Sequence, residues 1–128
     1  MSFKFSEAKE FNGDVSNWNV GSVKNMFKMF YKARDFNQDI SNWTVDSVSN
    51  MSYMFALADS FNQDISTCAM DNADDLTGMF YDETSFNWDI SSWRNHFSSD
   101  ITHDSFTGGT CTLAEENHPY VDWFTENL

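Results

Sequence analysis

The chain has 128 residues, of which 41% are hydrophobic, including 13 Phe and 5 Trp, so it is too rich in bulky apolar groups to be a disordered segment. Its formal net charge of −13 disfavours nucleic acid and anionic membranes as partners, because both repel an acidic surface. No apolar run reaches the roughly 18 residues that a transmembrane helix needs.

The motif FNQDIS occurs at residues 36–41 and 61–66, with near copies FNGDVS at 11–16 and FNWDIS at 86–91. This spacing predicts a half repeat at residues 1–10 followed by four 25-residue units, at 11–35, 36–60, 61–85 and 86–110. A unit of this length cannot enclose its own apolar face, so neighbouring units must stack to form a continuous core.

Each unit changes its hydrophobic period halfway. The first half, Asp14–Val20 in the first unit, mixes β-branched and aromatic residues with short polar ones, which predicts a brief strand. The second half has apolar residues at helical spacing, which predicts an amphipathic helix of about three turns; in the first unit these are Val23, Met26, Met29, Phe30 and Ala33. The expected fold is therefore an α/β repeat, a short solenoid with one strand and one helix per unit.

Stacking at this period places equivalent residues above one another. The expected columns are an aromatic one (Phe11, Phe36, Phe61, Phe86), a second one (Trp18, Trp43, Cys68, Trp93), and two polar ladders (Asn12, Asn37, Asn62, Asn87; Asp14, Asp39, Asp64, Asp89). Asn and Asp at tight turns usually bond nearby backbone groups, so we interpret the ladders as structural. Calcium binding stays the alternative, because columns of carboxylate and amide oxygens resemble calcium ligands.

The last part of the chain departs from the repeat. The pattern ends after Trp93, and residues 111–128 contain the only proline together with Tyr120, Trp123 and Phe124. We expect residues 111–128 to form a degenerate C-terminal cap over the open end of the stack. The alternative is that the three aromatic residues form a docking tail for a partner.

No motif for catalysis, metal binding or a cofactor is present. Cys68 and Cys111 are expected to be free thiols, because they lie in different columns of the stack. The three His residues do not have zinc-site spacing. We therefore expect a protein that is not an enzyme and that needs no cofactor and no metal.

Two sets of surface residues are candidates for partner binding. Six of the seven basic residues lie within residues 1–34, and four of them form a predicted basic docking edge: Lys24, Lys28, Lys32 and Arg34. A second set should point outward from the predicted strands: Asn17, Asn19, Asn42, Thr44, Ser92 and Arg94. The alternative for both sets is an ordinary solvated surface.

The stretch FNQDISNWTVDSVSNMSYMFALADSFNQDIS resembles the repeats of the BspA-like leucine-rich-repeat surface proteins, in its FNxDIS, NW and NMxxMF elements. The resemblance extends from residue 1 to about residue 94. It implies a right-handed, leucine-rich-repeat-like solenoid on a cell surface or outside the cell, with adhesion or protein binding as its role. It implies no catalytic residues.

The leading hypothesis is a non-catalytic protein–protein interaction module of the repeat type, used for surface adhesion or docking. Its partner is expected to be a protein, with a glycan as the alternative. A second hypothesis is a structural or assembly subunit of a larger complex, for example in an organelle or a photosynthetic membrane. An enzyme is the third, and only a polar cleft with a catalytic carboxylate would support it.

Overall fold

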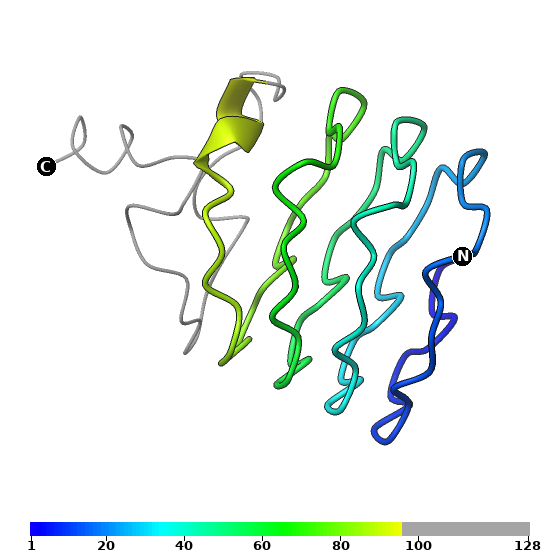
Figure 1. Cartoon of the computed structure of the whole chain (residues 1–128), viewed down its shortest axis with the longest axis vertical. Helices are drawn as coiled ribbons and strands as arrows, with labels where there is room; N and C mark the ends of the chain where they lie inside the picture. The colour runs from blue at the N-terminus through cyan, green and yellow to red at the C-terminus, as the bar shows by residue number, and fades with distance from the viewer. Residues whose placement is uncertain (96–128) are drawn as a thin grey trace, which may run out of the picture.

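Successive 25-residue circuits of the chain lie side by side as a stack in the computed structural model, which describes residues 1–95 (Figure 1). We call residues 11–35, 36–60 and 61–85 coils 1, 2 and 3; the part coils 1–10 and 86–95 flank them. Backbone hydrogen bonds keep the coils in register, for example from the Met26 N–H to the Asn50 carbonyl at 2.8 Å and from Met51 to Asp75 at 2.9 Å.

A ribbon of consecutive turns forms one side of each coil. This turn ribbon comprises residues 26–33 in coil 1, with counterparts at 1–8, 51–58 and 76–83. Every second N–H of residues 26–32 donates to the carbonyl 24 residues later, as Lys28 does to Ser52 at 3.0 Å and Phe30 to Met54 at 2.9 Å. Of the residues between them, Met29, Tyr31 and Ala33 donate three residues back within the ribbon, as Met29 does to Met26 at 3.1 Å, and Phe27 donates to the Asn25 side chain at 2.9 Å. The ribbon thus satisfies its backbone donors without forming a helix or a regular strand.

The prediction of one helix per unit is wrong, and the backbone angles give the reason. Two positions per ribbon have positive φ, for example Lys28 at 54° and Lys32 at 57°. A right-handed α-helix cannot pass through such residues. A positive φ at the third residue of a turn closed by an i to i+3 hydrogen bond is typical of type II turns. Met26 to Met29 and Phe30 to Ala33 are turns of this kind.

The prediction of one strand per unit is also wrong. The Asp14 side chain accepts a hydrogen bond from the Ser16 N–H at 2.9 Å, and the Trp18 N–H donates to the Val15 carbonyl at 3.1 Å, so the segment bends where a strand would extend. Strand-like pairing among residues 1–95 is limited to the isolated parallel bridges Asn25↔Asn50 and Asn50↔Asp75.

The predicted α/β, leucine-rich-repeat-like solenoid is therefore incorrect as a fold class. The one regular element in the described part of the chain is η1, a 3-10 helix at Ser91–Asn95. The predicted cap, residues 111–128, lies outside the described residues.

The core is an aromatic ladder with two columns. The predicted column is confirmed: the rings of Phe11, Phe36, Phe61 and Phe86 are nearly parallel, with centroids 5.9–6.0 Å apart from coil to coil. A second column, which the sequence analysis assigned to a helix, runs beside it; its members are Phe5, Phe30, Phe55 and Phe80. The two columns also stack closely where one coil passes into the next, as Phe30 of coil 1 does on Phe36 of coil 2 at 4.0 Å.

The predicted polar ladders have structural roles, each of a different kind. The Asn12 Oδ1 accepts a hydrogen bond from the Asn37 N–H in the next coil at 2.9 Å. The Asn37 Oδ1 in turn accepts one from the Asn62 N–H at 2.9 Å. Asp14, Asp39, Asp64 and Asp89 instead accept from the Ser two residues later in their own turns. The Asn ladder therefore joins coils, and the Asp ladder shapes the turn within each one.

Phe36→Ala should lower the free energy of unfolding by about 3–5 kcal/mol, because the ring is fully buried between two neighbouring rings of its column. Urea unfolding measures the change. The same substitution at Phe3, whose side chain is 54% exposed, is the control and should cost less than about 1 kcal/mol. Equal costs at the two positions would contradict the ladder as the core.

Candidate functional site

The turn ribbon separates inward from outward side chains in pairs. Met26, Met29, Phe30 and Ala33 are fully buried, whereas Phe27, Lys28, Tyr31 and Lys32 are only partly buried. Outward positions of the other ribbons also carry large side chains. Together they form an aromatic face, which we define as Phe3, Phe27, Tyr31, Tyr53 and Tyr81. The Phe27 ring makes edge-to-face contacts with the rings of Phe3 and Tyr53, at centroid distances of 5.2 Å and 6.4 Å.

A groove of about 280 Å³ opens in this face. It is lined by Phe27, Lys28, Tyr31, Tyr53, Leu57 and Tyr81. The second coil has the small residues Ser52 and Ala56, both buried, at the ribbon positions that Phe27 and Tyr31 occupy in the first. These small side chains leave space between the larger ones of coils 1 and 3, so the groove follows from sequence differences between repeats.

Gly78 allows one wall of the groove to form. Its φ is +60°, and a Cβ at this position would lie 2.5 Å from the Tyr53 ring. The equivalent positions in the other ribbons hold Phe3, Lys28 and Tyr53, also with positive φ. The glycine therefore relieves backbone strain and makes room for the Tyr53 ring over its own backbone.

Lys28 lines the groove, and Lys32 contacts the ring of one lining residue, Tyr31. The Lys28 Nζ lies 4.7 Å from the Tyr31 ring centroid and within 6.0 Å of the rings of Phe3, Phe27 and Tyr53. The Lys32 Nζ lies 5.2 Å from the same Tyr31 ring. Ring faces attract ammonium groups, so these contacts hold both cations against the aromatic face.

Gly78→Ala should destabilise the protein by more than about 2 kcal/mol, because a left-handed backbone position costs an alanine about 1–2 kcal/mol and the Tyr53 ring must also move. In a Tyr53→Ala background the same change should cost only the backbone share, about 1–2 kcal/mol. Urea unfolding of the four proteins gives both values. The same cost in both backgrounds would show that the ring does not pack on Gly78.

The predicted basic edge is divided in the structure. Lys28 lines the groove, whereas Lys32 contacts the Tyr31 ring from outside the groove lining and pairs with Glu7 at 3.8 Å. The Arg34 Nε is 3.9 Å from the Asp59 carboxylate, and Lys24 is exposed. Neither Lys24 nor Arg34 lines the groove, so Lys28 is the one member of the predicted edge in its lining. Whether the four residues act together as a docking edge stays a prediction.

The predicted polar surface is exposed but does not line the groove. Asn17, Asn19, Asn42, Thr44 and Ser92 are all exposed. The Arg94 side chain, Tyr120, Trp123 and Phe124 lie outside what the structure describes. Whether any of these residues binds a partner stays a prediction.

Sequence reasoning missed the four aromatic residues that line the groove: Phe27, Tyr31, Tyr53 and Tyr81. A signal for them was present, because each is aromatic and lies outside the repeating apolar columns. An aromatic residue that the core pattern does not need points to surface function.

A buried carboxyl group marks coil 3. Glu83 is fully buried at the position that Ala8, Ala33 and Ala58 hold in the other ribbons. Its carboxylate accepts hydrogen bonds from the N–H groups of Ser85 and Phe86. Burial raises the pKa of Glu83 to about 7, an effect that those two bonds oppose and the charge of Asp59 reinforces. A carboxyl group with a shifted pKa can serve in catalysis. Glu83, however, does not line the groove.

Glu83 should make stability fall as pH rises. Its pKa is raised from 4.5 to about 7 on folding, so between these values the native state binds more protons than the unfolded state. Ionisation should remove about 3 kcal/mol of stability between pH 4.5 and 8. Urea unfolding across this range should show the loss in the wild type. Glu83→Gln should lack this component, and parallel pH profiles for both proteins would contradict the assignment.

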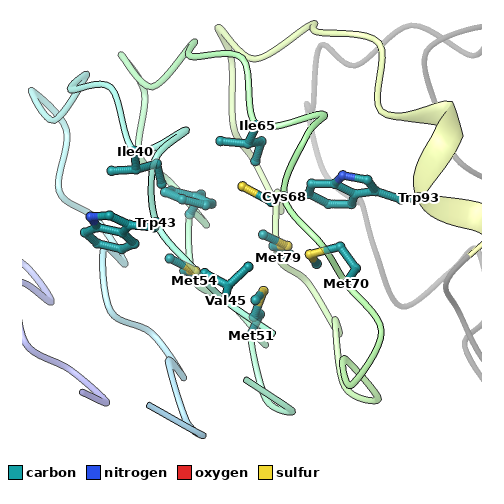
Figure 2. Close-up of a pocket in the computed structure, with 11 residues that line it drawn as sticks. Ile40, Trp43, Val45, Met51, Met54, Ile65, Cys68, Met70, Met79 and Trp93 are labelled. Atoms are coloured by element: carbon teal, nitrogen blue, oxygen red, sulfur yellow. The ribbon is translucent and has the colours of Figure 1, made fainter. Parts of the chain in front are cut away.

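The second hollow lies inside the stack, where Cys68 replaces a tryptophan. The predicted column is present, with Cys68 between Trp43 and Trp93 (Figure 2). The Trp43 Nε1 donates a hydrogen bond to the Val15 carbonyl of the preceding coil at 2.9 Å. The shorter Cys68 side chain cannot reach a carbonyl of its preceding coil in the same way. The smaller side chain leaves a cavity of about 20 Å³, whose lining includes Met54, Met70 and Met79. Only hydrophobic and sulfur-containing side chains surround it.

Cys68 has the properties of a structural cysteine. It is a free thiol, whereas Cys111 lies outside the described residues. Burial raises the pKa of the Cys68 thiol to about 11, and the charges of Asp64 and Asp39 add to this. The thiol therefore stays protonated at neutral pH and is a poor nucleophile.

Residues 1–95 contain no cluster of three or more His, Cys, Asp or Glu side chains that could hold a metal ion. Hydrogen bonds from Ser16, Ser41 and Ser91 lower the pKa values of Asp14, Asp39 and Asp89, so these carboxylates are ionised and serve their own turns. Within the same residues, no helix has the length and hydrophobicity to cross a membrane.

These features define a repeat protein of stacked turns with an aromatic ladder inside and an aromatic groove outside. The chain belongs to the DUF285 family, described as "Mycoplasma protein of unknown function", whose model matches residues 1–113. Searches of curated proteins and of solved structures gave no significant match.

Proposed function

We propose that this chain is a non-catalytic protein-binding module and that the aromatic face is its binding surface. The observation that carries the proposal is the groove, where Phe27, Tyr31, Tyr53 and Tyr81 gather outside the core. Tyrosine and phenylalanine are enriched at the centres of protein interfaces, because they supply large contact areas and lose little side-chain entropy on binding.

The exposure of this face supports the same conclusion. Phe3 is 54% exposed and Tyr81 is 41% exposed, although the protein has a packed core into which such residues usually go. A contiguous exposed aromatic patch is costly to keep in water and typically marks an interaction site. The resemblance of the repeats to BspA-like surface proteins supports adhesion as the setting for this binding.

The architecture supports a binding role rather than catalysis. The pKa of the Cys68 thiol is raised, so this thiol is a poor nucleophile. The buried carboxyl group of Glu83 does not line the groove. The groove itself offers aromatic rings, one leucine and one lysine. Such a lining can bind a partner and orient it, but it provides no paired acid and base for proton transfer.

Tyr31→Ser/Tyr81→Ser should weaken partner binding at least tenfold, as expected for anchors near the centre of an interface. The intact chain is used to capture partners from the native source. Each captured protein is then purified, and its affinity is measured by calorimetry for the wild type and for the variant. Circular dichroism and thermal unfolding confirm that the variant is folded.

Asn17→Ser/Asn42→Ser is the matched control, since it changes two exposed residues away from the groove. It should alter the affinity by less than twofold. If the control loses affinity and the tyrosine variant does not, binding occurs at the polar surface. Isolation of the chain only as a fixed, stoichiometric part of one complex that tolerates both variants would favour an assembly subunit.

A further inference from the structure

The groove has a cation that the described part of the protein does not neutralise. The ion pairs among residues 1–95 are Lys32 with Glu7 and Arg34 with Asp59. Lys28 takes part in neither, and its Nζ instead lies 4.7–6.0 Å from four aromatic rings. Rings attract the charge but accept hydrogen bonds poorly, so the N–H donors of Lys28 remain available to a ligand.

A carboxylate is the ligand group that fits this cation. Lys28 is partly buried among the rings, and an ion pair is stronger there than in open water because the local dielectric is lower. Hydrogen bonds between an ammonium and a carboxylate are about twice as strong as those between neutral groups. Lys32 adds a second positive charge near the Tyr31 ring. Its ion pair with the exposed Glu7, at 3.8 Å, is weak, so a ligand carboxylate can replace Glu7 as its partner.

The volume of the groove fits a side chain. The groove measures about 280 Å³, at the lower edge of the roughly 300–1,000 Å³ that is usual for small-molecule sites, so it has room for a single side chain. Its walls of Phe27, Tyr53, Leu57 and Tyr81 suit one aromatic or branched aliphatic side chain. A carboxylate on Lys28 beside it would place an acidic residue next to an apolar one in the ligand.

The lining favours a peptide over a glycan. A sugar presents many hydroxyl groups, and each one that is desolvated needs a hydrogen-bond partner. The groove contains no Asp, Glu, Asn or Gln, so only tyrosine hydroxyls and one ammonium group are available. An apolar side chain with one neighbouring carboxylate needs fewer polar partners.

The charge of the whole chain limits the acidity of this peptide. The net charge is −13, so a polyacidic ligand would be repelled even though Lys28 and Lys32 attract it locally. We propose that the groove binds an extended peptide segment of a partner protein that places one aromatic or aliphatic side chain in the groove and one adjacent carboxylate on Lys28. This inference rests on the proposed function and specifies the ligand.

The test uses a phage-displayed library of random seven-residue peptides, selected on the intact wild-type chain. The enriched peptides should contain one Asp or Glu adjacent to an aromatic or aliphatic residue. A synthetic copy of the best peptide should lose at least tenfold in affinity for Lys28→Met, and a similar amount when its acid is replaced by the amide. The two changes together should cost little more than either alone, because they remove the same contact.

Lys9→Met is the matched control, because Lys9 is an exposed lysine outside the groove. It should change the affinity by less than twofold. Tyr53→Ser should abolish measurable binding without unfolding the protein, which thermal unfolding verifies. Affinity that does not fall as salt is raised would count against the ion pair.

Other outcomes overturn the proposal in distinguishable ways. Enriched peptides that need Tyr53 but contain no acid would refute the carboxylate and leave the aromatic face as a protein-binding site. Failure of the library to enrich, together with glycan-array binding that Tyr81→Ser removes, would show a glycan site. Concentration-dependent dimerisation that Tyr81→Ser prevents would show that a second copy of the chain occupies the groove.

Discussion

The hydrogen bonds of the turn ribbon are the constraint on which the rest of the structure depends. The ribbons at 1–8, 26–33 and 51–58 send alternate N–H groups to the next coil, as Lys28 does to Ser52, and use most of the others to close their own turns, as Met29 does on Met26. An α-helix would direct its hydrogen bonds along its own axis and join no coils, and a regular strand would not close the turns. Because some of its N–H groups bond to the next coil and others close its turns, the ribbon holds neighbouring coils together and still keeps its side chains in inward and outward pairs.

The aromatic ladder follows from this division. Because the inward Phe of a ribbon falls close to the first Phe of the following coil, Phe30 and Phe36 stack at 4.0 Å, and the same contact recurs one repeat later between Phe55 and Phe61 at 4.1 Å. The outward positions are free of this requirement, and their identities vary from coil to coil. The groove exists because Ser52 and Ala56 are small where Phe27 and Tyr31 are large.

The sequence was sufficient to predict the 25-residue register, the Phe column and the Asn ladder, because each depends only on identical residues lying above one another. It misled on local structure for a physical reason. Tandem type II turns repeat every four residues and bury Met26, Met29, Phe30 and Ala33, the same i, i+3, i+4, i+7 spacing that an amphipathic helix shows. Lys28 and Lys32 gave no warning, since neither is a glycine or an asparagine. At the site, the sequence identified Lys28 by its charge, but the tyrosines were assigned to no role, although their place outside the repeating apolar columns was a signal for them.

The direction of the ribbon bonds has an electrical consequence. From Phe3 to Phe27, from Met26 to Asn50 and from Met51 to Asp75, the earlier coil donates and the later coil accepts. The peptide dipoles of the ribbon therefore align along the stack, as they do along a helix, with carbonyl oxygens facing the N-terminal end and N–H groups facing the other. Six of the seven basic residues lie within residues 1–34, and most of the acidic residues follow them. Within residues 1–95 the uneven charge thus complements the dipole of the ribbons, with most cations at the negative end and most anions toward the positive one.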